Sequence, residues 1–349
     1  MRRLLVLVAI PMAGVLSLAA TQTTASRPLA HRFEQVADGV YAAIGSGTAV
    51  NTGSNSMVIV NRDDVVVVDA HVTPAAARAL IDDIRTLTPK PVRWLIDTHY
   101  HWDHAHGNQA FGPDVQIIGQ DFVRQMLLTD VLHQRTYKSF TDPLPGQLAA
   151  LKRQAAAEQD PEKKRPLESR DATQQGYIDA LAAIRPTPPT LSYQTKMTLI
   201  RGDREIDLLF LGRGHTAGDT VVYLPKERVV ATGDLVVGDF RFMYMGDGFV
   251  NEWPETVDKV LQLDFTTVVP GHGPVFHDKT AMRHYQAYWR DLWKQASELH
   301  GRGVTAADAA RIVDLTMHQA DFPSIQGPGV DVRAMLRMYD VMEGRELPQ

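Results

Sequence analysis

Cysteine is absent from the 349-residue sequence. A chain without thiols cannot contain a disulfide framework, a cysteine nucleophile, a zinc finger or an iron–sulfur cluster. Any transition metal in this protein must therefore be held by histidine, aspartate or glutamate side chains. The sequence contains 13 histidines, and these are the residues from which such a site could be built.

An excess of basic residues is also lacking. Lysine and arginine number 36 against 41 aspartates and glutamates, which gives a formal net charge of −5 and a pI near 6.2. We expect no nucleic-acid partner, because proteins that bind nucleic acids carry basic patches. The 44% hydrophobic and 22% charged content is typical of a globular enzyme and excludes disorder as the dominant state. The length fits one large α/β domain or two modest ones.

A long hydrophobic run occurs only at the N-terminus. Basic Met1–Arg3 precedes an apolar stretch, and Ser17 and Ala19 suit the small-residue positions of a cleavage site. This pattern predicts a cleaved signal peptide over residues 1–20 and a periplasmic or secreted protein with no membrane span after cleavage. A transmembrane anchor is less favoured, because Pro11 interrupts a run that is barely long enough to span a bilayer.

The rest of the chain alternates short apolar runs with helical patterns. Helices are predicted from Thr73 to about Leu87, over residues 254–263, and from about Lys279 onward. Strands are predicted at residues 39–47, 56–60, 65–69, 92–97, 115–119, 197–201, 205–211, 220–224, 228–232 and 266–270. Two clusters of strands, with helices between and after them, favour an α/β fold with four αββα layers.

We expect this sandwich to occupy residues 30–278 as one domain. A polar, helical insertion is predicted around residues 120–190, broken by prolines 143, 145, 161 and 166, with too few large apolar residues for a core of its own. Residues 279–349 are expected to form a helical extension packed on the same domain.

A cluster of histidines follows directly after the strand predicted at residues 92–97. His99, His101, Asp103 and His104 lie within six residues, and burying them without a partner would be costly. Alternate residues of an extended backbone point the same way, so His99 and His101 could hold one ion while Asp103 and His104 face a second. Neutral imidazole and carboxylate ligands suit Zn²⁺, and also Fe²⁺ or Mn²⁺.

Three later segments each place one more candidate ligand at the end of a predicted strand. His215 lies in a glycine-flanked loop, Asp234 follows Gly233, and His272 lies between two glycines. The candidates form two sets of three with one bridge: His99, His101 and His215; Asp103, His104 and His272; and Asp234 between them.

Together these segments resemble the metallo-β-lactamase fold superfamily. The resemblance extends from about Gly39 to Gly273 and includes the superfamily's five motifs, of which Asp69 belongs to the first. It implies a dinuclear site at the seven residues above, with two Zn²⁺ ions as the expected cofactor. It also implies a metallohydrolase of small-molecule substrates, in which a metal-bridging hydroxide attacks an ester, lactone, thioester, β-lactam amide or phosphoester. Asp103 would orient this hydroxide and shuttle a proton.

The resemblance is less informative about the substrate. Asp234 at the bridging position resembles the hydroxyacylglutathione hydrolases (glyoxalase II), lactonases and phosphodiesterases of the superfamily. The predicted secretion signal argues against a glutathione thioesterase, since such thioesters are made in the cytoplasm, and fits β-lactams, lactones or exogenous esters better. Arg241, Tyr244 and Trp253 follow Asp234 in the sequence and are candidates for binding a substrate anion. The loop of residues 45–55 and the inserted helices could cover the site.

Two other functions stay open at this point. One is a mononuclear iron oxygenase of the same fold, similar to persulfide dioxygenases, which would contain one iron per chain and consume oxygen. The other is a non-catalytic periplasmic component that binds metal and acts through partners.

The remaining histidines and two aspartates are assigned other roles. We expect Asp69 and Asp219 to accept hydrogen bonds near the site, and His71 and His106 to lie close to it without binding metal. Ordinary surface positions are expected for the rest, namely His31, His133, His277, His284, His300 and His318.

Overall fold

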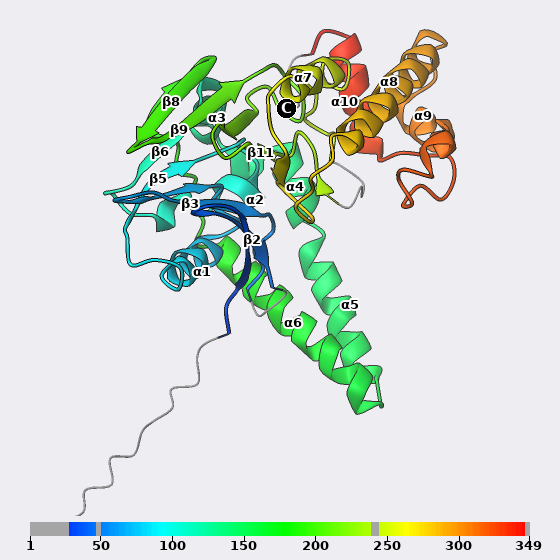
Figure 1. Ribbon diagram of the computed structural model, residues 1–349. Coiled ribbons are helices and arrows are strands. Elements are labelled where there is room, and N and C mark those ends of the chain that lie inside the picture. The colour runs from blue at the N-terminus through cyan, green and yellow to red at the C-terminus, as the bar shows by residue number, and fades with distance from the viewer. Residues whose placement is uncertain (1–27, 47–49, 239–243, 346–349) are drawn as a thin grey trace, which may run out of the picture.

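The computed structural model describes residues 28–46, 50–238 and 244–345. Two β-sheets pack face to face and helices cover their outer sides, so the predicted αββα sandwich is confirmed (Figure 1). The predicted signal peptide and Arg241 lie outside the described residues. None of the helices in the described part of the chain combines the length and hydrophobicity needed to cross a bilayer.

The first sheet has the order β1-β2-β3-β4-β5-β6-β7. Its first four strands are antiparallel, and from β4 onward neighbouring strands are parallel. The strands are β1 (His31–Ala37), β2 (Val40–Gly45), β3 (Ser56–Val60), β4 (Val65–Val68), β5 (Val92–Ile96), β6 (Gln116–Gln120) and β7 (Leu191–Tyr193). Strands β1 and β7 were not predicted from the sequence, because β1 is a half-exposed edge strand with polar residues and β7 has only three residues.

The second sheet has the order β12-β11-β10-β9-β8. Only the pair β11 and β12 is parallel within it. Its strands are β8 (Lys196–Arg201), β9 (Arg204–Phe210), β10 (Thr220–Leu224), β11 (Val229–Gly233) and β12 (Thr267–Pro270), all within two residues of the predicted bounds.

Apolar side chains fill the three interfaces between the four layers. Met57 and Val66 of the first sheet pack against Leu208 and Val222 of the second, and all four are buried. Burial of this kind stabilises the fold by about 1.5–3 kcal/mol per large side chain. The outer face of the first sheet is covered by α1 (Pro74–Ile84), whose N-cap Thr73 accepts a hydrogen bond from the amide of Ala76.

The other outer layer lies on the second sheet. It consists of α7 (Trp253–Leu261), α8 (Thr280–Gly301), α9 (Ala306–Ile312) and α10 (Val332–Met342). Trp289 of α8 is fully buried and stacks on Trp253 of α7 with ring centroids 4.4 Å apart. The C-terminal helices therefore share a hydrophobic core with the sandwich.

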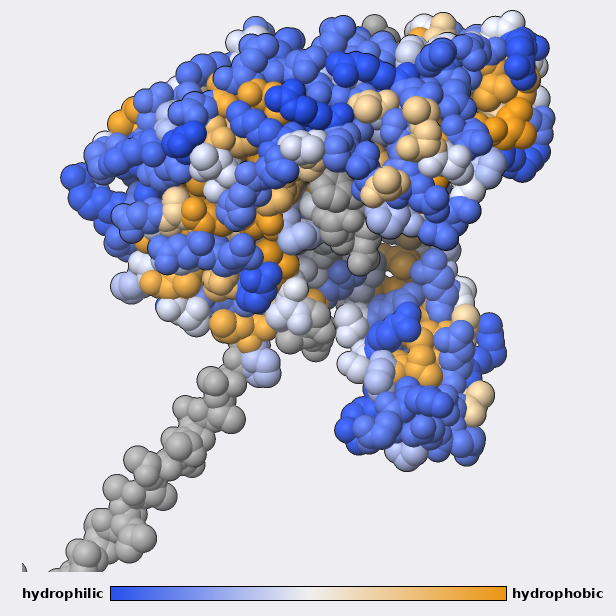
Figure 2. All heavy atoms as spheres, turned by 45° about the vertical axis from the view of Figure 1, so that its right-hand side comes forward, coloured by the Kyte–Doolittle hydropathy of each residue, from blue (hydrophilic) through white to orange (hydrophobic). Residues whose placement is uncertain are grey.

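The segment between β6 and β7 is helical, as the sequence predicts. It contains α3 (Asp121–Leu127), α4 (Arg135–Thr141), α5 (Leu144–Ala157) and α6 (Pro161–Leu181). Helices α5 and α6 form a hairpin that projects from the body of the molecule with a mainly hydrophilic surface (Figure 2). No residue of α6 is buried. The prediction that Pro166 breaks the insertion is wrong, because Pro166 lies within α6, in its second turn, and the helix continues through it.

Candidate metal centre

The candidate ligands meet at one edge of the sandwich because each follows the end of a strand. His99 lies three residues after β5, His215 follows β9, Asp234 comes directly after β11, and His272 lies two residues after β12. The short helix α2 (Trp102–Ala105) then turns Asp103 and His104 toward the same edge. Residues from four separate segments are thus brought within reach of one another.

The first group consists of His99, His101 and His215. One ligand atom from each lies within 4.8 Å of the others, and all three residues are buried. The closest approach is 2.9 Å, between Nδ1 of His101 and Nε2 of His215. The pKa of His215 is lowered to about 3, mainly by burial, so its ring is neutral and can act as a ligand.

The second group consists of Asp103, His104 and His272. Nε2 of His272 lies 3.2 Å from Oδ2 of Asp103, and Nε2 of His104 lies 3.8 Å from the same oxygen. The two imidazole nitrogens are 3.4 Å apart. His272 and Asp103 have the more accessible side chains, 34% and 17% exposed, whereas the side chain of His104 is fully buried. Small molecules can therefore approach the centre from the side of this pair.

Asp234 lies between the two groups. Its Oδ2 is 3.5 Å from Nε2 of His215 in the first group and 3.3 Å from Nε2 of His272 in the second. Its Oδ1 is 3.3 Å from Nε2 of His104. The carboxylate fits this position because residue 271 is glycine: a Cβ atom there would lie 2.0 Å from Oδ1 of Asp234.

Two aspartates outside the seven candidates orient the histidine rings. Asp69 accepts hydrogen bonds from Nδ1 of His104 at 2.7 Å and from the amide of Thr98 at 2.8 Å, which agrees with the acceptor role predicted for it. Its backbone has a φ of 65°, in the left-handed region that a residue with a side chain seldom adopts.

Asp247 holds the other histidine and was missed by the sequence analysis. It accepts hydrogen bonds from Nε2 of His101 at 3.0 Å, from the hydroxyl of Tyr100 at 2.6 Å and from Oγ1 of Thr136 at 2.6 Å. These bonds hold the pKa of Asp247 at about 2 despite its burial. With Nε2 donating to Asp247, Nδ1 of His101 is left as the ligand atom. The one sequence signal was the flanking Gly246 and Gly248, which resemble the glycines around His215.

Charge is concentrated at the second group. Burial opposes ionisation, but Asp234 and Asp103 raise the pKa of His272 to about 10. Burial is likewise outweighed at Asp103, where His104 and His272 lower the pKa to about 2. Without metal, these side chains therefore form a partly exposed network of ion pairs between protonated histidines and ionised aspartates.

The donor set fits divalent transition metals. Nε2 of His99 is buried and has no hydrogen-bond partner among the residues that the structure describes. His99 belongs both to the group with His101 and His215 and to a further group with His104 and Asp234. A buried polar atom without a partner is costly unless a bound group satisfies it. Nitrogen and carboxylate ligands at these spacings are suited to zinc.

The outcomes differ for the two described residues that were predicted to bind a substrate anion. Tyr244 lies beside the first group, with its ring centroid 5.9 Å from that of His101, and its role in substrate binding stays a prediction. Trp253 is fully buried and donates from Nε1 to the carbonyl of Leu235, so the prediction that it binds substrate is wrong. The ring centroids of Trp253 and His215 are 5.6 Å apart, so the indole packs against that histidine and helps to hold its position.

The prediction of a surface position is wrong for two histidines. His318 is buried and its Nε2 lies 3.1 Å from Asp291. His31 is buried between Asp83, 2.9 Å from its Nδ1, and His71, 2.9 Å from its Nε2. The burial of His31 could not be predicted, because the edge strand β1, which positions it, has no clear signal in the sequence.

Comparisons with known proteins agree with this geometry. The family model described as the Metallo-beta-lactamase superfamily matches residues 50–116 and 146–272, which is more than half of the chain. A metallo-beta-lactamase type 2 from Bacillus cereus is 23% identical over 240 residues, which cover 68% of this chain and 73% of that protein. The 2,4-dinitroanisole O-demethylase subunit alpha of Nocardioides sp. (strain JS1661) is 24% identical over 249 residues, covering 71% of this chain and 57% of that protein.

Solved structures share the fold. A metallo-beta-lactamase from Pontibacter korlensis superposes with a TM-score of 0.54 at 17% identity, covering 74% of this chain and 99% of that one. The FIM-1 metallo-beta-lactamase from Pseudomonas aeruginosa in its mono-zinc form gives a TM-score of 0.52 at 16% identity, covering 74% of this chain and 95% of that one. From its two-sheet sandwich, its clustered histidines and aspartates and the family match, this chain belongs to the metallo-β-lactamase superfamily, whose members are generally hydrolytic enzymes.

Proposed function

We propose that this chain is a dinuclear metal-dependent hydrolase that cleaves an ester, lactone, thioester or β-lactam amide. The observation that carries the proposal is the position of Asp234, whose carboxylate lies within 3.5 Å of imidazole nitrogens from both ligand groups. A carboxylate placed in this way could be shared by two ions, one held by each group, as in other two-metal hydrolytic sites.

The proposed ligands follow the two groups. His99, His101 and His215 would hold one ion, and Asp103, His104 and His272 the other, with Asp234 shared. Zn²⁺ is the expected metal, although the same donors accept Fe²⁺ or Mn²⁺. Asp247 and Asp69 would fix the ring orientation of His101 and His104, and with it the nitrogen that each ring presents.

Ions bound there would lower the pKa of water toward neutrality and polarise a scissile carbonyl. Asp103 would orient this water and take up a proton from it, because its carboxylate is ionised and partly exposed next to His272. The neutral rings of His99 and His215 supply no proton of their own, since burial keeps their pKa values low. No serine or cysteine nucleophile is required.

The substrate is proposed to be a small molecule met outside the cytoplasm. The apolar N-terminal run, which ends in Ser17 and Ala19, supports a cleaved signal peptide. Mass spectrometry of the protein recovered from the periplasm or medium is expected to show a mature N-terminus between residues 20 and 27. An intact Met1 would contradict secretion through this signal.

The function is tested by metal analysis together with a hydrolysis screen. Nitrocefin, acyl-homoserine lactones, 4-nitrophenyl esters and S-lactoylglutathione cover the proposed classes, and bis-4-nitrophenyl phosphate covers phosphoesters. Asp103→Ala is expected to lower turnover of any substrate found by about a hundredfold or more, whereas Asp278→Ala on the surface leaves it unchanged. One iron per chain with oxygen consumption would instead identify an oxygenase, and bound metal without any turnover would favour the non-catalytic role.

A further inference from the structure

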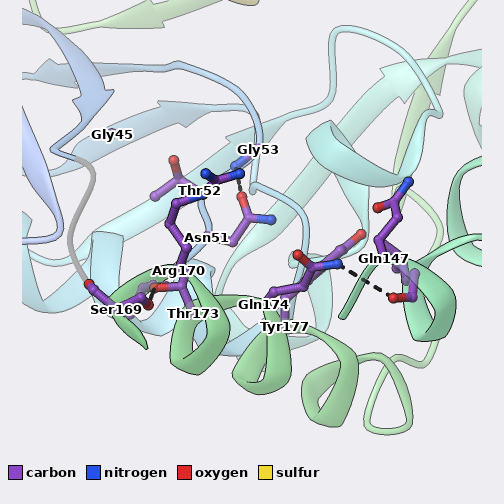
Figure 3. Close-up of a pocket in the computed structure, with 12 residues that line it drawn as sticks. Gly45, Asn51, Thr52, Gly53, Gln147, Ser169, Arg170, Thr173, Gln174 and Tyr177 are labelled. Atoms are coloured by element: carbon purple, nitrogen blue, oxygen red, sulfur yellow. Dashed lines mark hydrogen bonds between the residues drawn. The ribbon is translucent and has the colours of Figure 1, made fainter. Parts of the chain in front are cut away.

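A cavity of about 550 Å³ separates the α5–α6 hairpin from the loop that joins β2 to β3. The loop contributes Asn51, Thr52 and Gly53 to its wall, and the hairpin contributes Arg170 and Tyr177 among others. Figure 3 shows the side chain of Arg170 extending from α6 toward the loop residues. The two helices of the hairpin are joined by a hydrogen bond, since Nζ of Lys152 in α5 donates to Oε1 of Gln175 in α6 at 2.8 Å.

The loop wall of this cavity adjoins the metal centre. A Cβ atom at Gly53 would lie 3.0 Å from the Cβ of Asp103, so the loop backbone lies directly against that residue. The next residue, Ser54, donates from its hydroxyl to the backbone carbonyl of Asp103 at 2.6 Å. Tyr177, on the opposite wall, is close enough to Asp103 for the carboxylate to add to the raised pKa of the tyrosine, which burial mainly causes. Gly53 thus both lines the cavity and lies against Asp103, so the cavity and the accessible side of the centre are neighbours.

Arg170 is the one charged residue among the described residues that line the cavity. The rest of the lining is formed by amide and hydroxyl side chains, by glycines and by a few apolar residues, and no acidic residue of the described chain takes part. Arg170 supplies the positive charge, and no hydrogen bond or ion pair joins it to any other residue for which the structure gives a position. Arg165 on the same helix differs, because it forms an ion pair with Glu162 at 3.2 Å outside the cavity. The guanidinium of Arg170 is thus available to a ligand.

We propose that Arg170 binds a carboxylate of the substrate, so that the preferred substrates are esters, lactones or amides carrying a carboxylate some distance from the scissile bond. The planar guanidinium matches a carboxylate with two parallel hydrogen bonds, which a lysine cannot reproduce. The surrounding amides and hydroxyls, such as Asn51 and Gln174, supply further donors without competing charge. This inference rests on the proposed hydrolase function and specifies its substrate class.

The kinetic test compares two esters of similar length. Mono-4-nitrophenyl glutarate carries a carboxylate, whereas 4-nitrophenyl valerate is neutral. Arg170→Gln is expected to lower kcat/KM for the glutarate ester by about ten- to hundredfold, mainly through KM, and to leave the valerate ester within about twofold. Arg170→Lys is expected to restore part of the loss, and Arg165→Gln, which removes the same charge from the same helix, to change neither ester.

A binding measurement separates this inference from the hydrolase function. Isothermal titration with glutaramate, which carries a carboxylate, and with neutral glutaramide needs no turnover. The metal-loaded wild type is expected to prefer glutaramate, and Arg170→Gln to lose that preference. A wild type with no preference, a preference that survives in Arg170→Gln, or an equal loss in Arg165→Gln would each overturn the carboxylate site. Failure of the wild type to hydrolyse either ester would count against the proposed esterase activity, while the titration still decides the role of Arg170.

Discussion

Removing the carboxylate of Asp247 is expected to weaken metal binding although this residue is not a proposed ligand. Two of its three hydrogen-bond donors, His101 and Tyr100, share Oδ2, and Thr136 donates to Oδ1. In Asp247→Asn an amide oxygen can keep the Oδ2 position while the amide nitrogen donates to the hydroxyl of Thr136. The tautomer of His101 is then retained and only the negative charge is lost.

Asp247→Ala removes the acceptor altogether, so the His101 ring loses the partner that fixes its proton on Nε2. Loss of such a supporting partner typically weakens metal affinity about 10- to 100-fold, or about 1.4–2.7 kcal/mol. We expect Asp247→Asn near the lower limit and Asp247→Ala near the upper one. Competition for zinc against a chromogenic chelator measures both.

Two controls keep this result specific. Asp291→Asn alters another aspartate that pairs with a histidine, His318, away from the centre, and zinc affinity should not change. Urea unfolding of the metal-free variants reports the separate cost of leaving the buried hydroxyl of Tyr100 unpaired, about 1–3 kcal/mol, whereas the hydroxyl of Thr136 keeps the hydroxyl of Tyr244 as a partner at 3.1 Å. Wild-type zinc affinity in Asp247→Ala, or an equal loss in Asp291→Asn, would refute the orienting role of Asp247.

Three further predictions concern the centre and its support. Because the pKa of His272 is raised to about 10 without metal, its ring is protonated at pH 7 and zinc must displace that proton. Zinc affinity should therefore rise with pH, by up to about tenfold per pH unit for each proton released. Calorimetry in buffers of different ionisation enthalpy should detect this proton release. Gly271→Ala places a methyl group where Oδ1 of Asp234 lies, so metal content should fall while the circular dichroism of the folded chain is retained. Trp253→Ala should destabilise the protein by about 3–5 kcal/mol in urea unfolding, as expected for a fully buried tryptophan, and wild-type stability would show that the ring is not part of the core.

The elements that could be predicted are those whose own residues indicate a strand or a helix without knowledge of their neighbours in space. The valine runs of β4 and β12 are buried on both faces and read as strands without knowledge of their neighbours. Thr73 and Pro74 likewise fix the start of α1, although the helix ends at Ile84, three residues before the predicted end. The strand β1 has no such signal, because its polar side chains belong to an edge and its pairing with β2 is a tertiary property.

The same distinction applies to the candidate metal centre. The seven candidate ligands could be identified because glycines and strand ends mark them in the sequence, and the structure brings all seven together. Asp247 could not be assigned, since its partners Tyr100, His101 and Thr136 are more than a hundred residues away. Trp253 was misassigned because proximity in sequence to Asp234 does not reveal that α7 points its ring into the core.

The central claim is that two metal ions share one site, and zinc titration of the metal-free protein tests it most directly. Bound zinc and hydrolysis are followed together for the wild type and for Asp234→Ser, which lacks the shared carboxylate. We expect the wild type to bind two ions per chain and to need both for full activity. In Asp234→Ser the second ion should bind about 10- to 100-fold more weakly, with activity returning partly at high zinc. Full wild-type activity with one ion per chain, and no gain on adding more, would contradict the dinuclear account.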